Sequence, residues 1–160
     1  MKELVTISEK IAEQLIARKQ TIAVAESSTG GLISAALLSV PGASAYFLGG
    51  AVVYTRDARR LLIDIPDEAM KGIRSASEPY AKLLASQVRQ RFSTVWGLSE
   101  TGATGPTGNR YGDAAGHSCM AVAGPSHAVF TLETGSGDRQ ANMQAFAKTA
   151  LNLLLENLSR

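Results

Sequence analysis

The 160 residues of this protein lack cysteine pairs, a membrane-spanning segment and a signal peptide. A single cysteine, Cys119, excludes a disulfide within the chain, which is compatible with a reducing compartment. No apolar run approaches the roughly 20 residues of a membrane-spanning helix. The N-terminal residues Met1 to Leu4 mix charged with apolar side chains, unlike a signal peptide. We therefore expect a soluble, cytoplasmic protein without a membrane partner.

A strong excess of charge is missing too. The chain has 16 basic and 14 acidic residues and a net charge of +2, which is too balanced to indicate nucleic acid binding. The two histidines, His117 and His127, lie in separate expected strands, and no HxxH, HExxH or CxxC spacing occurs. The glycine-rich segment from Gly102 to Gly108 matches neither a Walker A motif nor GxGxxG. We expect no metal, no cofactor and no nucleic acid partner.

Helical and strand-like patterns alternate along the chain. The spacing of Leu4, Ile7, Ile11 and Leu15 predicts a first helix. Further helices are expected over residues 30–38 and 56–62, from Ser77 and from about Arg139, and strands over residues 21–25, 46–54, 94–98, 117–123 and 127–133. This order predicts one α/β domain over residues 1–160, a three-layer α/β/α fold. Its sheet would be mixed and mostly parallel, with about five strands and a late antiparallel hairpin.

A hydroxyl-rich turn stands where the first expected strand passes into a helix. Ser27, Ser28 and Thr29 are followed by Gly30 and Gly31, which open the helix. Backbone N–H groups and the helix dipole favour a phosphate or carboxylate at such a place. The same turn can present a serine as a nucleophile and serve an oxyanion. The alternative is that the hydroxyls merely cap the helix.

Two further segments follow expected strand ends. Tyr54 ends one strand, and a glycine-rich loop from Gly102 to Gly116 follows another. Glycines at every third position would let backbone N–H groups approach an anion, whereas the alternative is a flexible hairpin loop. Ligands of such sheets bind beyond the carboxyl ends of strands, so we expect Ser27, Tyr54 and Gly102 to converge on one cleft.

The chain resembles the CinA C-terminal domain family from roughly Leu4 to Leu158. The motifs that carry the resemblance are Ala25-Glu26-Ser27-Ser28-Thr29-Gly30-Gly31, Gly50-x-x-x-Tyr54, Ser77-Glu78-Pro79, Gly102-x-x-Gly105-Pro106 and Gly137-Asp138-Arg139. The family includes nicotinamide-mononucleotide deamidases, which hydrolyse the amide of the nucleotide to give nicotinic acid mononucleotide and ammonia. Its longer form carries an additional N-terminal domain, for which this chain is too short.

The resemblance assigns roles residue by residue. Ser27 matches the catalytic serine, Tyr54 the tyrosine at the end of the second strand, and Arg139 the arginine of the last motif. The expected catalytic residues are Ser27, Tyr54 and Arg59, and the expected substrate-binding residues are Glu26, Ser28, Thr29, Gly30, Gly31, Gly102, Thr104, Gly105 and Arg139. The expected ligand is a small-molecule nucleotide, and we expect a homo-oligomer.

The sequence departs from the family pattern at several positions. Ser28 stands where the family usually has cysteine, and Thr104 where it has alanine. The deamidases use a lysine, five residues after the tyrosine, as the base for the serine, and this chain has Arg59 there. A guanidinium stays protonated at physiological pH, so Arg59 cannot act as a general base. The segment from Gly108 to Asp113 also differs from the family's acidic, glycine-rich loop.

Two hypotheses follow. In the first, the protein is an amidohydrolase of a pyridine nucleotide, its base is Tyr54, Glu26 or His117, and Arg59 holds a phosphate or stabilises charge. In the second, it binds a nucleotide-like ligand without turnover, as a sensor or interaction partner. The alternative for the Arg56, Arg59 and Arg60 cluster is a solvated helix face.

Overall fold

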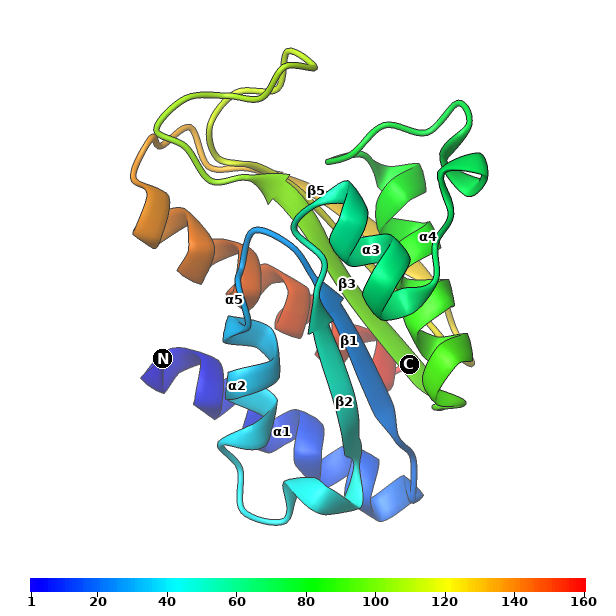
Figure 1. Cartoon of the computed structure of the whole chain (residues 1–160). Helices are drawn as coiled ribbons and strands as arrows, with labels where there is room; N and C mark the ends of the chain where they lie inside the picture. Colours follow the sequence, from blue (N-terminus) through cyan, green and yellow to red (C-terminus); the bar gives the residue numbers. More distant parts are fainter.

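The computed structural model describes residues 1–160 as a five-stranded sheet with helices on both faces (Figure 1). The strands are β1 (Ile22–Glu26), β2 (Phe47–Val52), β3 (Trp96–Ala103), β4 (His117–Ala123) and β5 (Ala128–Glu133). The α-helices are α1 (Lys2–Arg18), α2 (Leu32–Leu38), α3 (Arg56–Ile63), α4 (Glu78–Phe92) and α5 (Arg139–Leu158). Two short 3₁₀ turns, η1 (Ala43–Ala45) and η2 (Asp67–Met70), complete the chain. None of the α-helices is long and apolar enough to cross a membrane.

The sheet has the strand order β2-β1-β3-β4-β5. Strand β1 pairs in parallel with β2 and with β3, and the pairs β3–β4 and β4–β5 are antiparallel. Only β4 therefore runs against the other strands, and β4 with β5 forms the late hairpin. The predicted mixed, mostly parallel sheet is confirmed.

The two faces of the sheet carry separate hydrophobic cores. Ile22 and Val24 of β1 point to the face covered by α1, α2 and α5. Ala23 and Ala25 point to the opposite face, where α3 and α4 pack. A strand buried on both faces reads as a continuous apolar run, as β1 does. The predicted three-layer arrangement is confirmed.

Strand β3 is longer than the sequence pattern predicted. The expected strand ends at Leu98, but β3 continues to Ala103, because it pairs with β1 as far as Glu100 and with β4 as far as Ala103. Glu100 lies opposite Glu26 of β1 and Met120 of β4. Gly102 consequently belongs to the strand rather than to the following loop. A Cβ there would lie 2.6 Å from the backbone oxygen of His117, so only glycine fits without a shift.

Helix α2 begins later than predicted. It starts at Leu32 rather than Gly30, because Gly30 and Gly31 have φ values of +63° and +105°. These left-handed conformations favour glycine and turn the chain before the helix starts. The carboxyl ends of β1, β2 and β3 point to the same end of the molecule, where the loops that follow them gather (Figure 1).

Candidate functional site

A cleft of about 280 Å³ lies beyond the carboxyl ends of β1, β2 and β3. Ser27, Tyr54 and Gly102 line it together, so the predicted convergence of the three strand ends is confirmed. Arg59 of α3 lines the same cleft. The remaining lining residues are Val53, Thr55, Arg56, Ser75, Ala76, Tyr80, Thr101, Asn109 and Tyr111.

Ser27 is fixed at the cleft through its backbone. It directly follows β1, and its N–H donates to Glu100, 3.1 Å from the backbone oxygen and 3.2 Å from Oε1. The residue is half-buried. Its backbone is thus held by β3, at a position where the residue lines the cleft.

The side chain of Glu26, at the end of β1, accepts hydrogen bonds from the N–H groups at the start of helix α2. Its buried carboxylate accepts from the N–H groups of Gly31 at 2.9 Å, Ile33 at 3.1 Å and Ser34 at 2.9 Å. It also accepts from the hydroxyls of Thr29 at 2.7 Å and Ser34 at 2.8 Å. These N–H groups are therefore not free for a ligand, and the prediction of an anion site at this helix start is wrong. Glu26 is fully buried and does not line the cleft, so it is placed neither to bind a ligand there nor to act as a base for Ser27.

Glu100 is a second buried carboxyl group next to the turn, and the sequence analysis did not identify it as a site residue. It lies 2.5 Å from the Ser28 hydroxyl and 2.9 Å from the N–H of Thr29, and Ser118 contacts it at 3.2 Å. Burial raises the pKa of Glu100, and the nearby Glu26 raises it further, whereas the bonds from Ser28 and Thr29 lower it. Ser28 and Thr29 thus face inward to the carboxyl groups, away from the cleft.

Arg139 and the glycine loop support the cleft from outside it. The guanidinium of Arg139 donates through Nη1 to the backbone oxygen of Gly105, and through Nη2 to the Tyr54 hydroxyl at 3.3 Å. The backbone oxygen of Thr104 accepts from Asn142 at 2.9 Å. Thr104, Gly105 and Arg139 do not line the cleft, nor do Gly30 and Gly31. In this arrangement Arg139 positions Tyr54 and the loop.

Arg59 is buried at the edge of the cleft, with 8% of the residue exposed. Its Nε atom has no hydrogen-bond partner, and Nη2 lies 3.8 Å from Asp67 Oδ1. The guanidinium carbon lies 5.6 Å from the centre of the Tyr80 ring, a cation–π contact. Arg59 is therefore part of the packed wall of the cleft. The alternative of a solvated helix face is wrong for Arg59, whereas Arg56 and Arg60 are exposed, as that alternative predicts.

His117, a candidate base, lies outside the cleft. Its Nδ1 contacts a carboxylate oxygen of Glu133, and its Nε2 lies 2.7 Å from the backbone oxygen of Ala76. Burial is the largest single influence and lowers the pKa of His117, but the bonds to Glu133 and Ala76 and the charges of Asp113 and Glu133 together raise it more, and the net shift is upward. Both ring nitrogens face acceptors, which favours the protonated ring. His117 is thus unsuited to take a proton from Ser27.

Several lining residues were not predicted. Asn109 and Tyr111 come from the loop after β3, Ser75 and Ala76 from the segment before α4, and Tyr80 from α4 itself. Long loops frequently carry functional residues, which was the available signal for Asn109 and Tyr111. No local pattern connects the segment before α4 to Ser27, because the contact depends on the packing of α4 against the sheet.

Comparisons with known proteins give one consistent result. The CinA C-terminal domain family matches residues 4–158. A CinA-like protein of Anaeromyxobacter sp. (strain K) is 36% identical over 148 residues, which cover 92% of this chain and 36% of that protein. A CinA-like protein of Desulforapulum autotrophicum is 33% identical over 159 residues, 98% of this chain and 37% of that protein. The chain thus spans little more than a third of the length of these relatives.

Solved structures share the whole fold. The competence/damage inducible protein CihA from Agrobacterium tumefaciens has a TM-score of 0.90 at 26% identity, covering 99% of this chain and 96% of that one. The competence or damage-inducible protein from Enterobacter asburiae has a TM-score of 0.89 at 26% identity, covering 97% of this chain and 98% of that one. The chain belongs to the CinA C-terminal domain family.

Proposed function

We propose that this member of the CinA C-terminal domain family is an amidohydrolase of a pyridine nucleotide, with Ser27 as nucleophile. The observation that carries the proposal is the cleft itself, in which Ser27, Tyr54 and Arg59 meet beyond the strand ends. Nicotinamide mononucleotide is the substrate that the family resemblance suggests. The Ser27 oxygen would attack the amide carbon, ammonia would leave, and water would hydrolyse the resulting ester.

The surroundings of Ser27 support a fixed nucleophile. Hydrogen bonds to Glu100 hold its backbone at the end of a fully buried strand. Placing a reacting atom on a rigid element lowers the entropic cost of reaching the transition state. The guanidinium of Arg59 has an unpartnered Nε and lies in the same cleft, so it supplies positive charge for an oxyanion or for an anionic group of the ligand.

A serine nucleophile requires a base that takes its proton. Glu26 and His117 are engaged elsewhere, which leaves Tyr54 as the remaining candidate of the three. Tyr54 is exposed, and its hydroxyl accepts from Arg139 at 3.3 Å. A second candidate function follows from the same observation: a domain that binds the nucleotide without hydrolysing it. Arg59 in the position of the family's lysine favours this second function, since a guanidinium does not accept a proton.

Ammonia release from nicotinamide mononucleotide by the purified protein separates the two functions. For the hydrolase, we expect measurable release in the wild type and loss of release in Ser27→Ala, with thermal unfolding unchanged. Ser44→Ala is the matched control, because Ser44 is an exposed serine in η1. Binding of the nucleotide without ammonia release would support the second function. Turnover that survives in Ser27→Ala would exclude Ser27 as the nucleophile.

A further inference from the structure

A second pocket, of about 410 Å³, adjoins the Ser27 cleft, and we call it the basic pocket. Four arginines line it: Arg56 and Arg59 from α3, Arg74 from the segment before α4, and Arg110 from the loop after β3. The basic pocket shares Arg56, Arg59, Ser75 and Tyr111 with the cleft. A ligand held at Ser27 can therefore extend into the basic pocket without leaving the protein surface.

The positive charge of the basic pocket is only partly compensated. Asp113 pairs with Arg74 through two contacts of 2.6 and 3.1 Å. Asp67 lies 3.8 Å from Arg59 and 4.0 Å from Arg56, at the limit of an ion pair, and its side chain is 60% exposed. Arg110 has no carboxylate partner and reaches only the Tyr111 hydroxyl, at 3.0 Å. Two carboxylates thus face four guanidinium groups.

Arg59 also lacks a close carboxylate partner, and it is buried. Its residue is 8% exposed, yet its Nε has no acceptor and its nearest carboxylate is 3.8 Å away. A buried donor without a partner is unfavourable, and it gains most from an anionic oxygen. Arg59 lines both the basic pocket and the cleft, so an oxygen at their junction would be in its vicinity.

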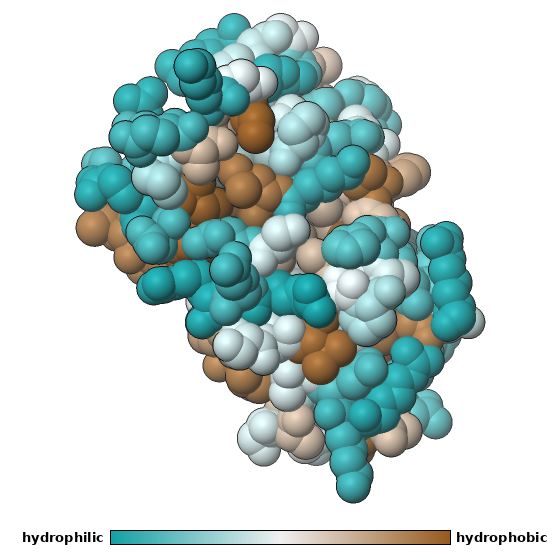
Figure 2. Space-filling model, turned by 90° about the vertical axis from the view of Figure 1, so that its right-hand side faces the viewer, coloured by the Kyte–Doolittle hydropathy of each residue, from teal (hydrophilic) through white to brown (hydrophobic).

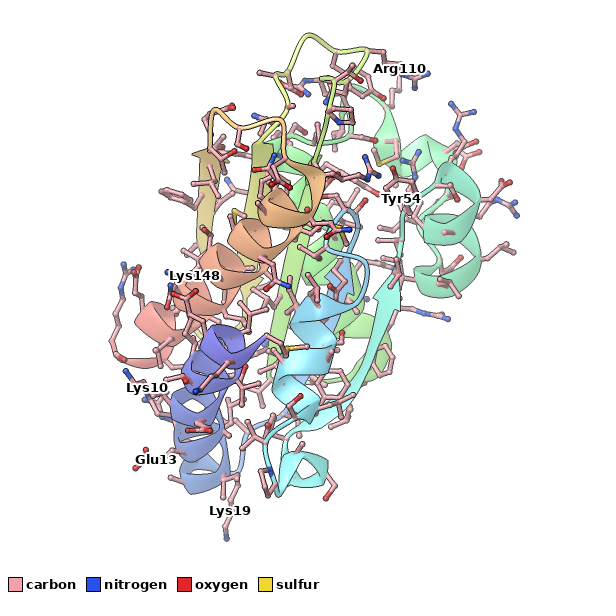
Figure 3. All side chains as sticks on the ribbon, turned by 90° about the vertical axis from the view of Figure 1, so that its left-hand side faces the viewer. Lys10, Glu13, Lys19, Tyr54, Arg110 and Lys148 are labelled. Carbon is pink, nitrogen blue, oxygen red and sulfur yellow. The ribbon has the colours of Figure 1, made fainter.

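The arginines at the rim are ordered in advance by an aromatic ring. The guanidinium carbons of Arg74 and Arg110 lie 5.5 and 5.1 Å from the centre of the Tyr111 ring. Arg110 and Tyr54 lie toward the same end of the molecule, opposite to Lys19 (Figure 3). Hydrophilic residues cover most of this end on the face that carries α3 and α4 (Figure 2). Ordered guanidinium groups lose less entropy on binding an oxyanion than free ones do.

We propose that the basic pocket is an anion subsite that takes a phosphate or diphosphate group of the ligand whose other end lies beside Ser27. The planar guanidinium fork suits phosphate oxygens, and groups from three segments can surround one tetrahedral anion. This assignment replaces the start of α2 as the anion site, because Glu26 already occupies the donors there. The placement of the ligand's other end rests on the proposed function, whereas anion binding in the basic pocket does not.

Calorimetric titration with inorganic pyrophosphate tests the subsite without any reaction. We expect saturable binding by the wild type, weakened about tenfold or more in both Arg110→Gln and Arg56→Gln, since each removes charged hydrogen bonds. Arg60→Gln is the matched control, because Arg60 lies on the same helix, pairs with Asp57 at 3.2 Å and does not line the basic pocket. No binding by the wild type, or an equal loss in Arg60→Gln, would overturn the proposal.

A second measurement separates this proposal from the hydrolytic function. Nicotinamide mononucleotide and its dephosphorylated riboside are compared for binding to the wild type and to Arg110→Gln. We expect the wild type to prefer the phosphorylated compound and Arg110→Gln to lose that preference, whether or not ammonia is released. Hydrolysis of both compounds with equal KM would overturn the anion subsite and leave the hydrolytic function standing. Pyrophosphate binding without any hydrolysis would do the reverse.

Discussion

The turn at the start of α2 and the basic pocket differ in how their hydrogen-bond donors are used. At the turn, Glu26 and Glu100 accept from the backbone N–H groups and hydroxyls that the sequence presents there. In the basic pocket, two carboxylates serve four arginines, and the Nε of Arg59 has no acceptor at all. The donors of the turn thus have acceptors within the protein, whereas some donors of the basic pocket do not.

This difference distinguishes polar groups that stabilise the fold from polar groups that can bind a ligand. A donor that already has a good internal acceptor gains little from a ligand, which must first displace that acceptor. A charged donor without an internal acceptor can form a charge-assisted hydrogen bond with a ligand without first displacing a protein group. The bonds to Glu26 and Glu100 therefore hold the turn that carries Ser27, while Arg59 and Arg110, which lack a close carboxylate partner, remain available to the ligand.

Among the predictions that test the difference between the two regions, Arg59→Lys has the largest expected effect, which is on the rate of ammonia release. If the wild type releases little ammonia from nicotinamide mononucleotide, Arg59→Lys should raise the rate by about 10²- to 10⁴-fold, the usual contribution of a general base. The physical reason is that a buried lysine can lose its proton and an arginine effectively cannot. Steady-state ammonia release measures the change.

The same experiment contains its own controls. Arg60→Lys, on the exposed side of α3, should leave the rate unchanged. Arg59→Ala removes the guanidinium without offering a base, so it should not raise the rate. Rapid turnover by the wild type that persists in Arg59→Ala would show that the base lies elsewhere and that Arg59 does not limit catalysis.

Removing the carboxylate of Glu26 tests whether the turn is satisfied from inside. Glu26→Ala leaves the N–H groups of Gly31, Ile33 and Ser34 without their acceptor, and each buried unsatisfied group costs about 1–3 kcal/mol. We expect the free energy of unfolding to fall by about 3 kcal/mol or more in urea denaturation. Glu13→Ala, an exposed position on α1 (Figure 3), should change it little. A similar loss in both variants would contradict the structural role of Glu26.

Much of the fold could be predicted because its signals are local. The apolar run of β1, the Ser77 and Pro79 start of α4 and the apolar stripe of α5 each depend on neighbouring residues. The side chain of Ser77 accepts from the N–H of Tyr80, as a helix cap does. The end of β3 could not be predicted, since a strand that contains Glu100 and Gly102 is stabilised by pairing with β1 and β4.

The candidate site was predicted in part for the same reason. Ser27, Tyr54 and Gly102 follow or end strands, and parallel strands bring such positions together. The internal roles of Glu26 and Glu100 could not be predicted, because a carboxyl group near an expected strand end is usually solvent-exposed unless it has partners, and those partners become known only in the folded structure. The basic pocket combines Arg59, Arg74 and Arg110 from three distant segments, and only packing brings them to one place.

The smallest expected effect concerns the protonation of Glu100, which accepts hydrogen bonds from the turn at the start of α2. The Thr29 hydroxyl has one proton, yet it lies 2.7 Å from an oxygen of Glu26 and 2.9 Å from one of Glu100. One proton cannot satisfy two charged carboxylates, so a proton held on Glu100 relieves the contact. Burial, the largest cause, raises the pKa of Glu100 in agreement with this geometry.

The pH dependence of stability tests this protonation. Because the folded pKa of Glu100 is raised above the unfolded value, its contribution to stability is complete below the unfolded pKa and is lost as pH rises through the folded pKa. Glutamine imitates the protonated acid, so Glu100→Gln should lose less stability than the wild type as pH rises above the ordinary carboxyl range. We expect the difference in the free energy of unfolding between Glu100→Gln and the wild type to grow with pH across this range, because the folded pKa of Glu100 is raised. Urea denaturation at several pH values measures it, with Glu13→Gln as the exposed control. Parallel pH profiles for Glu100→Gln and the wild type would mean that Glu100 is ionised in the folded protein and that Thr29 bridges two charged groups.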